Sequence, residues 1–183
     1  YEGLESKNIT INNGHVELVT VDDGINAVDT SVNATQGAWG MGFEATGNCS
    51  VYIRGGFVYI EAGGDGIDTN GNLEISGGYV IINGPTSGAM INSAIDFGYG
   101  SFKLTGGTVV AVGASMMAET PTAGSTQYSV LIHFSSAQQA NRLVNIQTAS
   151  GETVLTFRPT KEYESILFSS PDFTSGSYDV YLG

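Results

Sequence analysis

The sequence predicts an all-β fold in which short strands stack as the coils of a parallel solenoid. Glycine occupies 26 of the 183 positions and 13% of the residues are charged, a composition too apolar for disorder and too glycine-rich for a helical protein. Val, Ile, Thr, Tyr and Phe, which favour strands, are abundant, whereas helix formers are scarce. The third observation is internal repetition, which is the signature of repeat architectures.

The repeated unit is a pair of short alternating strands on either side of a turn. It occupies residues 8–27, 50–69, 72–97 and 101–113. The turns fall at Asn13-Gly14, Gly55-Gly56, Gly77-Gly78 and Gly106-Gly107, so the second glycines are 42, 22 and 29 residues apart. About 21 residues is the length of one solenoid coil.

Two of these spacings need an explanation. A spacing of 42 equals two coils, so we interpret residues 30–48 (TSVNATQGAWGMGFEATGN) as a degenerate coil with a loop. A spacing of 29 is one coil plus an insertion around residues 84–90 (GPTSGAM). Insertions of this kind leave the stack as loops, often on a binding face.

Alternation along each strand predicts the side chains that point into the stack. Before the turns they are Ile9, Ile11, Val51, Ile53, Leu73, Ile75, Phe102 and Leu104; after the turns they are Val16, Leu18, Val58, Ile60, Val80 and Ile82. Residues 1–126 therefore form the coils. Residues 127–183 lack the glycine turn and the acidic motif, and we expect strands of the same domain that continue or cap the solenoid, with a small separate sandwich as the alternative.

The acidic charge is concentrated in the first half of the chain. Residues 1–100 hold 12 acids against Lys7 and Arg54, giving −10, whereas residues 101–183 hold 6 acids against 4 bases, giving −2. This distribution argues against nucleic acid as a partner and suits divalent cations. No apolar run approaches about 18 residues, so we expect no membrane insertion. Because Tyr1 begins in mid-pattern, we expect a domain trimmed from a longer protein.

An acidic motif, as in VDDGINAVD at residues 21–29, recurs at the same phase of successive coils. Superposing the coils predicts two columns of side chains: Glu5, Asn26, Asp68 and Asp96 in one, and Glu2, Asp23, Asp65 and Ser93 in the other. Equivalent positions on successive coils lie about 4.8 Å apart, where unneutralised carboxylates repel. Carboxylate and amide oxygens at such spacing suit Ca²⁺. The alternative is that Asp-Gly and Asn only form turns.

Several motifs together resemble an extracellular bacterial carbohydrate-binding family. They are DDGINA, GDGIDTNG, ISGGYVIINGPTSG, MMAETP, STQYSVL and SSPDFTSGSYDVYLG, and in this order they span nearly the whole chain. Members of that family are right-handed parallel β-helices, similar in fold to pectate lyases, which carry calcium and bind cellulose and acidic sugars. The stretch TQGAWGMGFEA, residues 35–45, has no counterpart in the family's motifs.

The resemblance implies a calcium-containing module that binds plant cell-wall polysaccharide outside a bacterial cell, as part of a secreted or surface-attached protein. The matching positions imply calcium ligands at Asp22, Asp23, Asn26, Asp65, Asp68 and Asp96, to which the column adds Glu5. Aromatic faces cover the C–H-rich planes of neutral sugars. The candidates for that role are Trp39, Phe43, Tyr52 and Tyr99.

Two other functions remain open. A calcium-dependent polyuronate lyase would need a basic side chain with a lowered pKa to remove the proton beside the uronate carboxylate, and the candidates are Lys7 and Arg54. Alternatively, each of these side chains only compensates nearby carboxylates. A structural or adhesive solenoid would use calcium for stiffness alone. We expect a noncatalytic polysaccharide-binding module.

Overall fold

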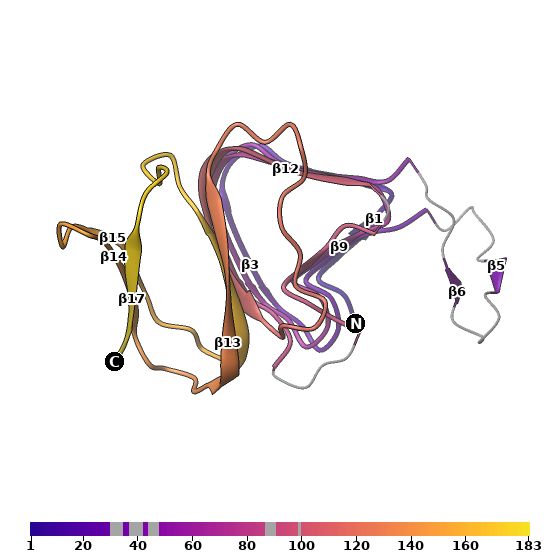
Figure 1. The fold of residues 1–183 in the computed structure, drawn as a ribbon. Helices are drawn as coiled ribbons and strands as arrows, with labels where there is room; N and C mark the ends of the chain where they lie inside the picture. Colours follow the sequence, from indigo (N-terminus) through magenta and orange to yellow (C-terminus); the bar gives the residue numbers. More distant parts are fainter. Residues whose placement is uncertain (30–34, 37–41, 44–47, 87–90, 99) are drawn as a thin grey trace.

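The expected all-β class is confirmed. The structure, a computed structural model, describes residues 1–29, 35–36, 42–43, 48–86, 91–98 and 100–183, and every regular element in these residues is a strand. A stack of parallel strands is followed by an antiparallel C-terminal unit (Figure 1). Within these ranges the chain forms no helix that could cross a lipid bilayer.

One wall of the stack is a parallel sheet of four very short strands. In spatial and chain order these are β1 (Leu4–Ser6), β4 (Ile25–Ala27), β9 (Ile67–Thr69) and β11 (Ile95–Asp96). Leu4 is in register with Ile25, Ile25 with Ile67, and Ile67 with Ile95. The same branched apolar residue type thus recurs at one position of each strand, and it points into the stack.

The other wall is a longer parallel sheet that bends at the glycine turns. Before the turn it contains β2 (Asn8–Ile11), β7 (Ser50–Ile53) and the first parts of β10 (Asn72–Asn83) and β12 (Ser101–Gly113). After the turn, β3 (His15–Val19) and β8 (Phe57–Glu61) pair in parallel and continue into the second parts of β10 and β12. In the residues that the structure describes, the stack has four layers: β1–β3, then β4 with β7 and β8, then β9 with β10, then β11 with β12.

The glycine turns stack directly on one another. Gly14, Gly56, Gly78 and Gly107 all have positive φ, from 81° to 103°, a conformation that residues with a Cβ rarely adopt. A Cβ on Gly78 would lie 2.5 Å from the carbonyl oxygen of Gly56, so the layers also leave no space for one. The positive φ explains why the turn keeps glycine in every layer, and the lack of space adds to it at Gly56, Gly78 and Gly107.

The predicted inward-facing residues form the core of the stack. Those of the second, third and fourth layers are fully buried, and Ile9 and Ile11 of the first layer are 9% and 7% exposed. Val16 and Leu18 are only partly buried, because β3 lies at the end of the stack, where it pairs with β8 alone among the described residues.

The long spacings are both insertions, which corrects one prediction. β2 pairs directly with β7 and β4 directly with β9, so no layer lies between the first and second, and the degenerate coil expected for residues 30–48 is wrong. The described part of that segment is an antiparallel pair, β5 (Thr35–Gln36) with β6 (Gly42–Phe43). The 29-residue spacing is one layer plus an insertion, as predicted, since Asn72 is in register with Ser101.

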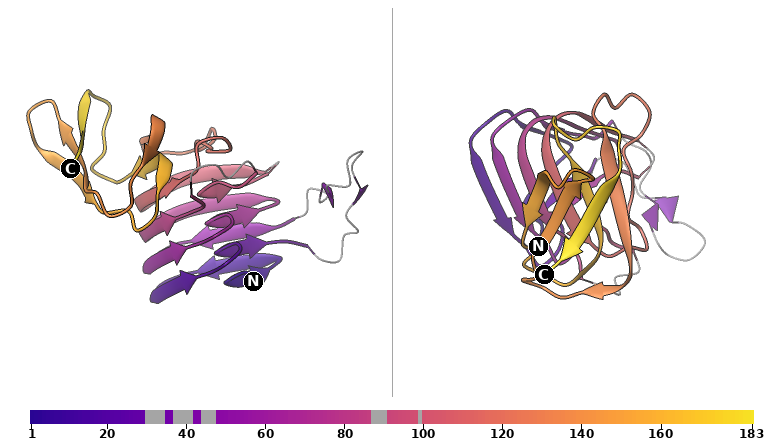
Figure 2. Two further views of the ribbon diagram at one scale, coloured as in Figure 1. Left: turned by 90° about the horizontal axis from the view of Figure 1, so that it is seen from below. Right: turned by 60° about the vertical axis from the view of Figure 1, so that its left-hand side comes forward.

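The C-terminal unit covers the edge of the last layer. β16 (Tyr163–Ser169) pairs antiparallel with β12, and β13 (Ser129–Gln138) pairs antiparallel with β16, extending the second wall. β15 (Thr153–Phe157), β14 (Val144–Thr148) and β17 (Tyr178–Leu182) form a separate antiparallel sheet beside it (Figure 2). A second apolar cluster includes Val110 and Val112 of β12, so this strand contributes to both cores.

Candidate functional site

The first predicted column of polar side chains is present in the structure. Glu5 is in register with Asn26, Asn26 with Asp68, and Asp68 with Asp96, on the four strands of the first wall. The neighbours of Asn26 and Asp68 on either side, such as Ile67 and Thr69, are buried, so the column faces away from the core.

The second column lies just before each of these strands and links the layers by hydrogen bonds. The Asp65 amide donates to Asp23 Oδ1 at 2.7 Å, and the Ser93 amide donates to Asp65 Oδ1. One oxygen of each aspartate therefore accepts a backbone N–H of the next layer. Hydrogen bonds between layers and turn formation therefore explain part of the acidic motif.

The two columns meet in a cluster of three carboxylates. Oxygens of Asp23, Asp65 and Asp68 all lie within 4.8 Å of one another. Asp23 is 9% exposed and Asp65 is 7% exposed. In the part of the chain that the structure describes, neither of these two forms an ion pair with a basic side chain.

The cluster is unfavourable for ionised carboxylates. Burial, together with the charges of Asp23, Asp68 and Asp96, raises the pKa of Asp65 to about 8, although the hydrogen bond from Ser93 lowers it. Burial also raises the pKa of Asp23, with Asp22, Glu2 and Asp96 adding to the effect. A hydrogen-bonded turn alone does not require three acids here, whereas a bound cation would offset their repulsion.

An unpartnered oxygen lies in the same column. Asn26 Oδ1 is buried and has no hydrogen-bond partner among the described residues, and Asn26 is the register neighbour of Asp68. A buried oxygen without a partner is uncommon, because it loses its hydration without compensation. Three clustered carboxylates, with an amide oxygen on the neighbouring strand, are hard donors of the kind that Ca²⁺ prefers.

The other predicted metal ligands lie around this cluster and are not part of it. Glu5 and Asp22 are exposed, and Glu5 lies in the end layer. Asp96 continues the column on the far side of Asp68, and its Oδ1 accepts the Gly98 amide at 2.8 Å. The sequence did not indicate Glu119, whose Oε2 accepts the Phe97 amide at 3.2 Å beside Asp96.

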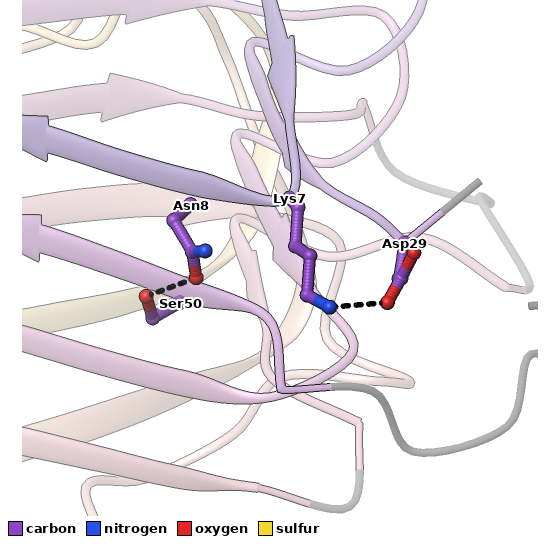
Figure 3. A network of polar contacts seen from close by, with 4 residues as sticks. All are labelled: Lys7, Asn8, Asp29 and Ser50. Carbon is purple, nitrogen blue, oxygen red and sulfur yellow. Dashed lines mark hydrogen bonds and ion pairs between the residues drawn. The ribbon is translucent and has the colours of Figure 1, made fainter. Parts of the chain in front are cut away.

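The basic residues considered for lyase chemistry have other contacts. Lys7 forms an ion pair with Asp29, which raises the pKa of Lys7 through a hydrogen bond and charge attraction (Figure 3). Beside it, Asn8 and Ser50 are hydrogen-bonded at 2.8 Å across β2 and β7. The Arg54 guanidinium lies 5.5 Å from the centre of the Tyr52 ring and 3.4 Å from Asn12 Oδ1.

The predicted sugar-binding aromatics are only partly described. Trp39 and Tyr99 lie outside the described residues, as does the side chain of Phe43, whose backbone belongs to β6. Tyr52 lies half-buried on β7 beneath Arg54. Sequence reasoning missed Phe57 and Tyr79, which are 36% and 61% exposed on the outside of the second wall. Each residue comes directly after a Gly-Gly turn, at a position where the alternation along the strand points the side chain outward. This pattern could have identified both residues from the sequence.

In comparisons with family models, curated proteins and solved structures, no match to the chain was found.

Proposed function

We propose that the protein is a noncatalytic, calcium-containing module that binds plant cell-wall polysaccharide outside a bacterial cell. In this proposal the four layers are coils of a right-handed parallel β-helix, as in the carbohydrate-binding family that the sequence motifs resemble. The parallel register of the first wall and the stacked glycine turns support that architecture.

The observation that carries the proposal is the cluster of Asp23, Asp65 and Asp68. Buried carboxylates are normally paired or bind metals, because an isolated buried charge is strongly unfavourable. Asp23 and Asp65 have no basic partner in the described chain, and the Asn26 oxygen next to Asp68 is unsatisfied. Asp23, Asp65, Asp68 and Asn26 would hold the ion.

Bound calcium would supply positive charge to acids from the second and third layers. It would offset their repulsion and so favour the stacked state. In a module with a net charge of −12, a cation of this kind would also allow an acidic sugar to approach the protein's own carboxylates. This role requires no proton transfer to the ligand.

The contacts of Lys7 and Arg54 favour binding over elimination. A lyase base must lose its proton near neutral pH, whereas the ion pair with Asp29 keeps Lys7 protonated. Arg54 is held against Tyr52 and Asn12 on the second wall, whereas the acid cluster lies at the first wall. The two candidate bases therefore have roles that do not involve the acid cluster.

The experiment is sedimentation of the protein with insoluble cellulose and with calcium-gelled polygalacturonate, in calcium and after chelation. The gel itself depends on calcium, so soluble polygalacturonate is followed in parallel by affinity electrophoresis. Ultraviolet absorbance of unsaturated products is recorded in the same samples. We expect the protein to bind at least one polysaccharide with no rise in absorbance.

Each other outcome would be decisive. A rise in absorbance that Lys7→Ala or Arg54→Ala abolishes would make the protein a lyase. Failure to bind any polysaccharide, together with melting that depends on calcium, would instead favour a structural or adhesive solenoid.

A further inference from the structure

A hollow on the outside of the second wall has the chemistry of a sugar site, and Tyr52, the predicted sugar-binding residue whose side chain the structure describes, does not line it. The C-terminal sheet stands beside the later layers of the stack (Figure 2). Between them is a cavity of about 430 Å³, which we call the outer groove, bordered by Tyr79 and Thr108 on the stack and by Glu152, Asp172 and Tyr178 of the C-terminal unit. Small-ligand sites usually measure about 300–1,000 Å³.

A row of aromatic side chains leads into the outer groove. His15, Phe57 and Tyr79 occupy the same register position on β3, β8 and β10, and Thr108 continues the row on β12. Successive positions are about 4.8 Å apart. The rings of His15 and Phe57 meet edge to face, with centres 5.1 Å apart, whereas Tyr79 at the mouth of the groove is 61% exposed.

The far side of the groove is held in place before any ligand arrives. The Tyr178 hydroxyl donates to the Thr174 carbonyl at 2.9 Å, and its ring packs 4.6 Å from that of Phe173. The turn between β14 and β15 is closed by two backbone hydrogen bonds of 2.8 Å, between Thr148 and Glu152 and between Gly151 and Thr148. A preformed site loses less entropy when a ligand binds.

The lining determines the kind of sugar. Its polar groups are mostly hydroxyls, with the carboxylates of Glu152 and Asp172 and, in the described residues, no basic side chain. Carboxylates and hydroxyls hydrogen-bond to sugar hydroxyls, and an exposed tyrosine ring can cover an apolar sugar face. A polyuronate would meet two like charges with no cation between them.

We propose that the outer groove and the row of Phe57 and Tyr79 bind a neutral, polyhydroxylated glycan chain. This inference rests on the proposed polysaccharide-binding function and assigns its neutral ligands to a face of the molecule separate from the acid cluster. The alternative for His15 and Phe57 is cross-strand pairing that only stabilises the sheet. That alternative gives no role to the exposed ring of Tyr79.

The test is isothermal titration calorimetry with cellohexaose and with a galacturonate oligosaccharide of the same length. Tyr79→Ala should weaken cellohexaose binding about tenfold, the loss expected from a stacked ring. Tyr79→Phe, which keeps the ring, should bind nearly as well as the natural protein. The matched control is Tyr181→Ala, because Tyr181 is 52% exposed and lies on the opposite face of β17 from Tyr178. Melting curves of each variant establish that it is folded.

The outcomes separate this inference from the function on which it rests. Cellohexaose binding that Tyr79→Ala leaves unchanged would overturn the groove and leave the polysaccharide-binding function standing. Tighter binding of the galacturonate oligosaccharide, lost in Tyr79→Ala, would overturn the assignment to a neutral glycan. If the natural protein binds neither these oligosaccharides nor any polysaccharide, the proposed function itself is wrong.

Discussion

At the scale of single residues, the acidic motif combines two requirements. The glycine of each Asp-Gly pair gives the space for close stacking, since a Cβ on Gly24 or Gly66 would lie 2.6 or 2.5 Å from a carbonyl oxygen of the next layer. The aspartate links that layer through one oxygen, as Asp23 does with the Asp65 amide. The remaining carboxylate charge explains why a cation is expected.

The charge on Asp65 makes stability depend on pH when calcium is absent. Its pKa is about 8 in the folded protein and about 3.9 in an unfolded chain, so the folded state holds a proton that the unfolded state has released between these values. The free energy of unfolding should therefore fall as pH rises through this window. Thermal melting of calcium-free protein at several pH values measures the fall.

Asp65→Asn provides the control for this prediction. Its amide oxygen can still accept the Ser93 hydrogen bond but carries no charge, so the decline in melting temperature with pH should flatten. Asp179→Asn, which changes an exposed acid on β17, should keep the natural slope. Equal slopes in all three proteins would contradict the raised pKa of Asp65.

Gly66→Ala should destabilise the stack by about 1–3 kcal/mol, the usual range for overpacking. The added methyl would lie 2.2 Å from Ile82 Cγ2 as well as 2.5 Å from the Ala94 carbonyl oxygen. Gly176→Ala is the matched control, because its methyl would make only ordinary contacts at 3.6 Å or more. Denaturant unfolding compares the two, and an equal effect would refute close packing at Gly66.

At the scale of elements, the strands and their inward faces could be predicted from alternation, and the columns from the repeat of the acidic motif. Residues 30–48 were misassigned because 42 is close to twice the coil length, and a spacing does not distinguish a weak coil from an insertion. Asn8 pairs directly with Ser50, so the segment is an insertion and not a coil. In the next layer, the equivalent connection from β9 to β10 contains only two residues, Asn70 and Gly71.

Removing residues 29–48 and joining Val28 to Cys49 should therefore preserve the fold. Ala27 and Ser50 would then be separated by two residues, as Thr69 and Asn72 are, and the 42-residue spacing would become 22. The change removes the Lys7–Asp29 ion pair, and because the Lys7 side chain lies at the surface, the pair adds little to stability. We expect a β-rich circular dichroism spectrum and a melting temperature within a few degrees of the natural protein.

The same deletion distinguishes the aromatic candidates. Glycan binding that survives it would exclude a necessary role for Trp39 and Phe43 and agree with the outer groove. A deleted protein that does not fold would contradict the interpretation of this segment as an insertion.

At the scale of the whole molecule, the C-terminal unit determines which surfaces are exposed. β16 occupies the edge of β12, and the second core covers Val110 and Val112 on the outward face of that strand. Sequence patterns predicted strands here but not where they pack, because that depends on contacts between residues far apart in the chain. For the same reason the outer groove could not be found from the sequence.

A fragment ending at residue 126 should aggregate or associate through β12. It would expose a long strand edge together with two buried valines, a combination that promotes pairing between chains. Size-exclusion chromatography at several concentrations compares the fragment with the full chain. A monomeric fragment with an unchanged melting temperature would show that the C-terminal unit does not protect this edge.

The most direct test of the account is a calcium titration of chelator-treated protein by isothermal titration calorimetry, with melting temperature recorded at each end point. We predict saturable binding, a higher melting temperature with calcium, and loss of both in Asp65→Asn combined with Asp68→Asn, whereas Asp179→Asn behaves as the natural protein. Absence of binding heat and an unchanged melting temperature in the natural protein would contradict the proposed role of Asp23, Asp65 and Asp68.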